Sequence, residues 1–458
     1  MNLLISVPAS RQTALEWVAG IVFGDMLGLP FAVAATAETD RVVLSADDRS
    51  LVMPSVYPDL TSDEPFVVPA PPLAEFDPSR HGLSAVDIEA SLPVIFGAPA
   101  LEIAEKSIMC GIDILGSIFF MLSRHEEVVL THRDKHDRFQ ATASLAYKGG
   151  FLERPVVDEY VEVLWEAMAR LWPTLRRRRR QGEIRVSCDV DWPFDPVGKS
   201  ANMLMRTLRY DIFRHRNPGI ARNRVRNFIS HRKGDYRFDP NHTFDWYMDV
   251  CELNGRRAAF YFIPDHSAGA IDGSYDIAEP RILTLIRKLA DRGHEIGMHG
   301  SYNTYRDVSQ IVKERGLLMK ACSTAGADAS VMGNRQHYLR WDAAETPDHL
   351  DNAGFEYDTT GSFADRPGFR YGTSYPFAMW SWNKKAPLRL LQRALVIMEC
   401  SVLDRDYLGL GYTEKSLTLM QELKRKSMRL GGDFTLLWHN SYFLRQKDRH
   451  FFQTLVSL

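Results

Sequence analysis

The sequence predicts an α/β protein, in which a parallel sheet covered by helices follows a smaller α/β region. The first observation is that beyond Gly182 short apolar segments alternate with amphipathic helical patterns, as in chains built from βα units. The second is the length of 458 residues, which allows two to four domains. The third is the composition, because 45% hydrophobic and 25% charged residues are typical of a globular chain.

Charge and cysteine content exclude several classes of protein. Lysine and arginine number 56 against 58 acidic residues, so the net charge of −2 gives no overall field that would attract nucleic acid or an anionic membrane. The five cysteines form no CxxC pair, which argues against a disulfide framework and favours a reducing compartment.

The N-terminus does not have the pattern of a secretion signal. Its opening residues, MNLLISVPASRQTALEW, lack a basic segment before the apolar stretch. The most apolar window, residues 17–35, contains Asp25 and Pro30, and it therefore predicts a buried helix and strand and not a membrane span. We expect a cytoplasmic protein without a transmembrane segment.

The rest of the N-terminal region predicts short elements and two helices. Residues 41–99 are rich in Pro, Asp and Ser, which indicates loops and short strands. Residues 112–122 predict a buried helix, and apolar residues at helical spacing predict another after Pro155. Five arginines at 176–180 then predict a solvated linker, with contact to phosphate or nucleic acid as the alternative. We place the domain boundary directly after this run, which gives an N-terminal α/β domain of unknown role at 1–181 and a second domain at 182–458.

The second domain predicts strands and helices in alternation. The expected strands are residues 184–190, 258–263, 295–298, 394–399 and 434–438. The expected helices are residues 280–292 and 414–430, each followed by glycine at a C-cap position. This order predicts a parallel sheet, either closed as a barrel or open.

A basic segment at about residues 200–240 interrupts the alternation. Between residues 201 and 240 there are ten Lys or Arg against three acidic residues, with apolar residues interleaved. The pattern predicts basic amphipathic helices. They are either a solvated insertion or a docking surface for an anionic glycan, a sugar phosphate or a lipid head group.

Two carboxylates end the first predicted strand of the second domain. Asp189 and Asp191 share a face of the strand, close to the carboxyl edge of the sheet where α/β proteins bind ligands. Adjacent carboxylates push their pKa values apart, so one could bind a metal while the other moves protons. A helix N-cap or a surface loop is the alternative.

Candidate metal and proton-transfer residues follow two other strands. His299 lies just after the strand at 295–298, and Asn303 shares its face if a helical turn starts there. Imidazole and carboxylate suit zinc, whereas an amide oxygen is a weaker ligand. His439 ends the last strand and is placed to deliver a proton at the same edge of the sheet.

In chain order, the segments DVD, GHEIGMH, RQHYLRWD and LLWHNSYF resemble the motifs of the polysaccharide deacetylase family, carbohydrate esterase family four. The resemblance covers roughly residues 184–443, with GHEIGMH as its most specific part, and it implies a distorted (β/α) barrel. The last two segments are similar to a polysaccharide-cluster branch of the family. FFMLSRHEE and FLERPVVDEY resemble the leader domain that accompanies this branch.

The resemblance implies catalytic roles for four residues. Asp189 would be the general base, oriented by a charge-assisted hydrogen bond from Arg335. The backbone N–H of Tyr338 would help hold the oxyanion, and His439 would be the general acid that protonates the departing amine. An acidic residue that tunes His439 is also implied, and the sequence leaves three candidates: Glu399, Asp404 and Asp406.

The resemblance also implies a divalent metal, Zn²⁺ by its ligand types, bound by Asp191 and His299. Asn303 stands where the family usually has a second histidine. Three readings follow: a weaker but working metal site, a site completed by another residue, or an inactive descendant that only binds glycan. The aromatic residues that could stack on sugar rings, with core packing as the alternative, are Trp192, Tyr302, Trp341 and Trp438.

The function implied is a metal-dependent hydrolase that removes an N-acetyl group from an amino sugar in surface polysaccharide biosynthesis or modification. The basic segment would suit an anionic or lipid-linked glycan, and no nucleic acid is expected. Removal of an O-acetyl or another acyl group would share the chemistry. The alternative from a different class is a catalytically inactive glycan-binding or assembly protein.

Overall fold

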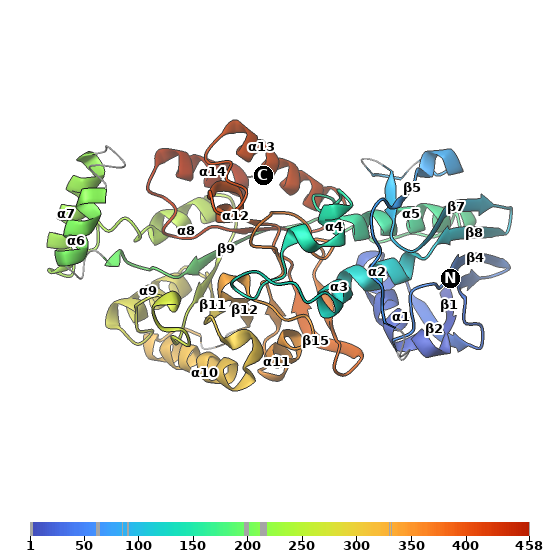
Figure 1. Cartoon of the computed structure of the whole chain (residues 1–458), viewed down its shortest axis with the longest axis horizontal. Coiled ribbons are helices and arrows are strands. Elements are labelled where there is room, and N and C mark those ends of the chain that lie inside the picture. Colours follow the sequence, from blue (N-terminus) through green and yellow to red (C-terminus); the bar gives the residue numbers. More distant parts are fainter. Residues whose placement is uncertain are drawn as a thin grey trace.

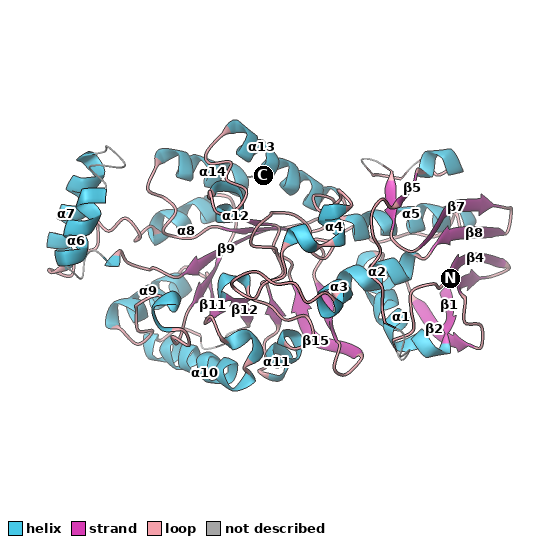
Figure 2. Cartoon of the chain, viewed as in Figure 1, coloured by secondary structure: helices cyan, strands magenta, loops and turns pink. Residues whose placement is uncertain are grey.

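The computed structural model describes residues 3–60, 65–84, 86–88, 91–196, 201–210, 218–328, 330 and 332–457. Two large sheets, each covered by helices, account for most of these residues (Figures 1 and 2). The mixed α/β class predicted from the sequence is confirmed. Among the described residues, no helix combines the length and the apolar character needed to cross a bilayer.

The first sheet is mixed and has six strands in the order β2-β1-β3-β4-β8-β7. Only the β1–β2 and β4–β8 pairs are parallel. Its strands are β1 (Leu3–Pro8), β2 (Phe31–Thr36), β3 (Arg41–Ala46), β4 (Arg49–Pro54), β7 (Gly97–Ile103) and β8 (Ser107–Ile112). A separate hairpin pairs β5 (Ala74–Phe76) with β6 (Leu92–Val94). The short strands predicted at 41–99 are therefore present.

The helices of this region follow the predicted pattern. They are α1 (Gln12–Ala19), α2 (Ile114–Ser123), α3 (His125–Val129), α4 (Leu145–Lys148) and α5 (Val156–Leu171), and α1 continues into a π-helical segment, Gly20–Met26. The helix predicted at 112–122 is α2, but Ile112 ends β8, and Asp113 caps the helix by accepting a hydrogen bond from the Gly116 N–H. The helix predicted after Pro155 is α5.

The second sheet has nine strands in the order β14-β15-β13-β12-β11-β10-β9-β17-β16, and it curls like half of a barrel (Figure 1). All neighbouring pairs are parallel except β14–β15. Its strands are β9 (Ile184–Val190), β10 (Ala259–Phe262), β11 (Glu295–Gly300), β12 (Gly333–Gln336), β13 (Tyr357–Asp358), β14 (Phe377–Ser381), β15 (Ala386–Gln392), β16 (Ile397–Met398) and β17 (Phe434–Leu437).

Helices surround this sheet. They are α8 (Phe244–Leu253), α9 (Pro280–Asp291), α10 (Val308–Ala325), α11 (Thr346–Asn352), α12 (Glu399–Leu403), α13 (Glu414–Arg429) and α14 (Gln446–Val456). Helices α6 (Ala201–Tyr210) and α7 (Pro218–His231) form the predicted basic insertion and project from one end of the molecule (Figure 1). Residues 197–200 and 211–217 of that segment lie outside the described residues.

Most of the elements predicted for this half are present, with one correction. The strand expected at 394–399 is only Ile397–Met398, because Glu399 already begins α12. Strands β9 and β17 are buried along nearly all of their length, as expected for inner strands of a sheet covered on both faces. Their carboxyl ends meet at one edge of the sheet, which places the residues that follow them around a common space.

Two glycines let aromatic side chains fill the interior of the curled sheet below this edge. A Cβ atom on Gly297 would lie 2.4 Å from the Tyr261 ring, and one on Gly333 would lie 2.3 Å from the Tyr357 hydroxyl. The two tyrosine hydroxyls are 3.0 Å apart and share a hydrogen bond. The Tyr261 ring in turn packs against the guanidinium of Arg335.

The two halves of the chain are joined by a buried ion network. Glu127, in α3, forms ion pairs with Arg124 at 2.8 Å and with Arg370 at 2.6 Å, and all three side chains are buried. From the arginine run predicted to be a solvated linker, Arg180 pairs with Asp433 at 2.6 Å. The domain boundary at 181/182 remains a prediction.

Candidate active site

A cavity of about 1050 Å³ lies at the carboxyl ends of the parallel strands. Asp189 and Asp191 reach it from the end of β9, His299 from β11 and His439 from the end of β17. His337, the first residue after β12, lines it as well. Segments that are far apart in the sequence thus bring two carboxylates and three imidazoles together.

Three of these residues form a group of potential metal ligands. Asp191, His299 and His337 each offer one ligand atom, and the three atoms lie within 4.8 Å of one another. The Nε2 atom of His299 is 3.3 Å from Asp191 Oδ1, and the Nε2 atom of His337 is 3.8 Å from Asp191 Oδ2. The sequence did not single out His337 as a ligand.

Hydrogen bonds at the far side of each ring fix the tautomer of both histidines. His299 Nδ1–H donates to the carbonyl of Arg335 at 2.9 Å, and His337 Nδ1–H donates to the carboxylate of Asp272 at 2.8 Å. Each ring therefore turns the lone pair of its Nε2 toward Asp191. Metal-bound histidines are usually held in this way.

The carboxylate of Asp191 is suited to a cation. Its Oδ1 atom is buried and has no hydrogen-bond partner among the described residues. Burial opposes its ionisation, but positive charge on the rings of His337, His299 and His439 holds the pKa of Asp191 well below its usual range. A divalent ion such as zinc would supply that positive charge in place of the ring protons, with Nε2 of His299 and His337 as its ligands.

Asp189 forms a buried ion pair with Arg335. The buried guanidinium donates from Nη1 to Asp189 Oδ1 at 2.8 Å, and its other donors bind Ser187 and Thr359. The guanidinium also lies 4.8 Å above the Tyr261 ring. These contacts leave Asp189 Oδ2 facing the cavity, 3.5 Å from His299 Nε2.

His439 is paired with Glu399. Its Nδ1–H donates to the buried Glu399 carboxylate, which also accepts the backbone N–H of His439 at 3.0 Å. Burial opposes the charged imidazole, but Glu399, Asp191 and Asp189 together raise the pKa of His439 to about 10. Three acidic residues were candidates for tuning His439, and Glu399 is the one that binds it. Asp404 instead accepts a hydrogen bond from the Tyr442 hydroxyl, and Asp406 lines the cavity.

The backbone at Tyr338 has an unusual conformation. Tyr338 and Leu339 have φ values of 61° and 55°, in the left-handed region that costs non-glycine residues about 1–3 kcal/mol each. The carbonyl of Tyr338 accepts a hydrogen bond from Arg138 at 3.1 Å. The backbone of Tyr338 is therefore restrained beside the potential metal ligands.

Asn303 lies away from the metal-ligand group. Its side-chain amide donates to the carbonyl of Ser267 at 3.0 Å, and its oxygen accepts from Arg340 at 3.3 Å. It is exposed and does not line the cavity. The prediction that Asn303 is a metal ligand is therefore wrong. It assumed a helical turn directly after His299, whereas the chain forms a short 3₁₀ turn that begins only at Thr304 (Thr304–Arg306).

The four aromatic residues expected to bind sugar are placed differently from one another. Trp192 lines the cavity. Trp341 and Trp438 are only 2% and 0% exposed and pack in the core, so the expectation that they stack on sugar is corrected in favour of core packing. Tyr302 stacks under Arg340, with its ring 4.0 Å from the guanidinium carbon, and does not line the cavity.

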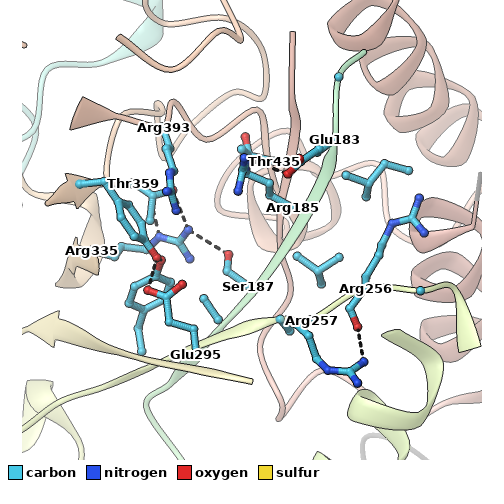
Figure 3. Close-up of a pocket in the computed structure, with 18 of the residues that line it drawn as sticks. Glu183, Arg185, Ser187, Arg256, Arg257, Glu295, Arg335, Thr359, Arg393 and Thr435 are labelled. Atoms are coloured by element: carbon cyan, nitrogen blue, oxygen red, sulfur yellow. Dashed lines mark hydrogen bonds and ion pairs between the residues drawn. The ribbon is translucent and has the colours of Figure 1, made fainter. Parts of the chain in front are cut away.

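A second cavity, of about 750 Å³, lies at the opposite, amino-terminal ends of the same strands (Figure 3). Its charged lining includes Arg185, Arg256, Arg257, Arg393 and Glu295. The described part of the chain has two groups of potential metal ligands, Asp191 with His299 and His337, and Glu399 with Cys400 and His439, and neither belongs to this second cavity. The candidate active site is therefore the cavity at the carboxyl ends.

The N-terminal half also contributes to the candidate site, which the sequence did not predict. The cavity is lined by Asp134, Lys135, His136, Arg138 and Gln140. Local patterns could not reveal this, since the contact between Arg138 and Tyr338 joins residues 200 positions apart.

Comparison with known proteins adds a family match for the N-terminal half. Residues 3–173 match a family of unknown function, DUF7033. No curated protein matches the chain. A crystal structure of a provisionally assigned polysaccharide deacetylase from Mycobacterium smegmatis is similar at 16% identity, covering 61% of this chain and 84% of that one, with a TM-score of 0.38.

Proposed function

We propose that the chain is a metal-dependent hydrolase that removes an N-acetyl group from an amino sugar. The observation that supports this most is that a potential metal site, a potential base and a potential acid line one cavity. The metal site is the ligand group around Asp191, the base is Asp189 bonded to Arg335, and the acid is His439 bonded to Glu399. Metal-assisted amide hydrolysis uses a Lewis acid, a base and an acid in this proximity.

We assign the metal to Asp191, His299 and His337, with His337 in place of Asn303. This choice follows from the lone pairs of the two rings and from the unpartnered oxygen of Asp191. Of the three readings that Asn303 left open, it corresponds to a site completed by another residue. Two imidazoles and one carboxylate are a common set for catalytic zinc, which keeps a further position for water.

A divalent ion held there would lower the pKa of a water molecule and polarise the acyl carbonyl. Asp189 Oδ2, the oxygen not bonded to Arg335, then accepts the proton of that water while the water oxygen bonds to the acyl carbon and the carbonyl oxygen takes up the negative charge. The backbone N–H of Tyr338 donates to the developing oxyanion.

Collapse of the tetrahedral species requires a proton on the sugar nitrogen, because an amine anion is a poor leaving group. Nε2 of His439 provides it, and Glu399 stabilises the charged ring at Nδ1 before the transfer. The C–N bond breaks, and acetate and a free amino sugar are released.

The amino sugar as substrate rests on the resemblance of the sequence motifs. Zinc as the native metal, a role in surface polysaccharide biosynthesis and a cytoplasmic location are predictions of the same kind. Of the four aromatic residues named from the sequence, we propose only Trp192 as a sugar contact, because Trp192 lines the cavity.

The test is acetate release by the purified full chain loaded with Zn²⁺. N-acetylglucosamine oligomers and an O-acetylated sugar serve as substrates, with Asp189→Asn and His439→Gln as inactive controls. We expect release from the N-acetylated sugars that both substitutions abolish. Binding of the oligomers without any acetate release would favour the glycan-binding alternative, and release from the O-acetylated sugar alone would assign an esterase.

A further inference from the structure

We infer that residues 134–138, from the N-terminal half, complete the active site, with Arg138 as a positioning residue for the backbone of Tyr338. The catalytic consequence of this role rests on the proposed function. The placement of the segment, called here the 134–138 loop, rests on hydrogen bonds between residues far apart in the sequence.

Asp134 organises the loop from within. Its Oδ1 accepts the backbone N–H groups of His136 at 2.8 Å and Arg138 at 3.0 Å. Its Oδ2 accepts Nε of Arg138 at 2.9 Å and forms an ion pair with Nη2 at 2.8 Å. Two of the three guanidinium nitrogens of Arg138 are thus held within the loop, and Nη1 is aimed outward in a fixed direction.

The outward nitrogen of Arg138 meets the strained backbone of the site. Nη1 donates to the carbonyl of Tyr338 at 3.1 Å, and Tyr338 has a φ of 61°. Bulky residues rarely adopt this conformation unless their surroundings determine it. The His136 ring, 4.8 Å from the Tyr338 ring, restrains the side chain of the same residue.

The loop is tied to the catalytic half by further bonds. Arg340 donates from Nε to the carbonyl of His136 at 2.8 Å. Asp137 accepts hydrogen bonds from Arg306 Nη1 at 2.8 Å and from the Tyr305 hydroxyl. Because these partners follow β11 and β12, the loop bridges the two segments that carry His299 and His337.

Through these contacts the N-terminal half would hold the backbone of Tyr338 in place. Tyr338 supplies the proposed oxyanion donor, and the direction of its N–H depends on the left-handed backbone that Arg138 stabilises. Loss of Arg138 should release that backbone while leaving the metal ligands in place. The region matched by the uncharacterised family would thereby contribute one wall of the active site and the restraint on its oxyanion donor.

The experiment compares the full-length wild type with Arg138→Ala and, as matched control, Arg133→Ala. Arg133 lies in the same stretch, and among the described residues it donates to the carbonyls of Leu130, His132 and Glu127, all in the N-terminal half. Three quantities are measured for each protein: hydrogen exchange in peptides that cover residues 337–341, Zn²⁺ affinity, and kcat and KM for acetate release.

For Arg138→Ala we expect exchange in residues 337–341 to be about tenfold faster, because one charge-assisted hydrogen bond is lost. We also expect kcat to fall about tenfold to a hundredfold while KM and Zn²⁺ affinity change less than about threefold. Millimolar guanidinium, or the conservative Arg138→Lys, should restore part of kcat. Arg133→Ala should match the wild type in all three measurements.

Unchanged exchange in Arg138→Ala, or an equal increase in Arg133→Ala, would overturn the inference. A fall in kcat without faster exchange would also overturn it, since Arg138 would then act by another route. If the wild type releases no acetate, the proposed function fails, and the exchange comparison still decides whether Arg138 holds Tyr338.

Discussion

Asp272 accepts a hydrogen bond from Nδ1 of His337 at 2.8 Å, and this contact determines which nitrogen of the ring faces Asp191. Asp272 is fully buried and also accepts the backbone N–H of Tyr302 at 2.7 Å. Burial opposes its charge, but His337 and the backbone donors lower the pKa of Asp272, so it remains a carboxylate. A buried carboxylate behind a histidine is the arrangement that metal sites use to orient a ligand.

Substitution of Asp272 by asparagine should weaken metal binding although the residue touches no metal. We expect the Zn²⁺ dissociation constant to rise about tenfold to a hundredfold, because the ring of His337 loses its charged partner. Competition with a chromophoric chelator measures the change. Asp276→Asn, at an exposed position four residues away, should leave the constant unchanged, and equal constants for both variants would show that Asp272 does not orient His337.

His337 and Asn303 should differ sharply as metal-site positions. His337→Ala should raise the Zn²⁺ dissociation constant by about a hundredfold or more, since it removes one of three protein ligands. Asn303→Ala should change it by less than about threefold, because the amide is bound to Ser267 and Arg340. The same chelator competition compares the two. The reverse order of effects would restore Asn303 as the ligand.

Glu399→Gln should slow catalysis without removing the metal. The neutral amide no longer stabilises the charged ring of His439, so we expect kcat to fall about 10²- to 10⁴-fold with Zn²⁺ affinity nearly unchanged. Steady-state kinetics with a parallel metal titration separates the two effects. Glu422→Gln, exposed on α13, is the control, and a full-rate Glu399→Gln enzyme would mean that His439 is not the acid.

Parts of the fold could be predicted because their sequences carry a local signal. Strands β9 and β17 are apolar runs, and α9 and α13 have helical apolar spacing. In contrast, β12 has the sequence GNRQ without an apolar side chain, and it is a strand because its polar groups are satisfied by distant partners. Asn334 donates to Asp358 at 2.8 Å, and the backbone N–H of Gln336 donates to Thr360 at 2.9 Å.

The same reason explains what was missed in the site. Asp189 and His299 lie in the last residues of strands that could be recognised, and Asp191 and His439 follow such strands, so their convergence could be anticipated. His337 follows the unrecognised β12, and its tautomer depends on Asp272, 65 positions earlier. The sequence offered one signal for His337 as a ligand, which is its position two residues after Arg335, the partner of Asp189. The contribution of the 134–138 loop had no local signal.

Glu127→Gln should destabilise the fold. The substitution leaves the buried guanidinium groups of Arg124 and Arg370 without their shared carboxylate. We expect the free energy of unfolding to fall by about 3–5 kcal/mol, as when one partner of a buried ion pair is removed. Denaturant titration measures this. Glu105→Gln, at an exposed position, should change it by less than about 0.5 kcal/mol, and a similarly small effect at Glu127 would contradict the proposed importance of the network.

The contribution of Glu127 should also depend on pH. Burial opposes its charge, but Arg370 and Arg124 lower the pKa of Glu127 to about 2 in the folded chain, against 4.5 as the reference value. A carboxylate with a lowered pKa stabilises the fold fully above its unfolded pKa and loses this effect as pH falls toward the folded value. The stability difference between wild type and Glu127→Gln should therefore shrink between pH 4.5 and pH 2. A constant difference over this range would show that Glu127 is not ionised in the folded protein.

The most direct test of the central claim is anomalous diffraction at the zinc edge from crystals soaked in Zn²⁺. Our account predicts one peak in the cavity, about 2.0–2.2 Å from Asp191 and from Nε2 of both His299 and His337. A peak coordinated without His337, or no peak among these residues at millimolar zinc, would contradict it.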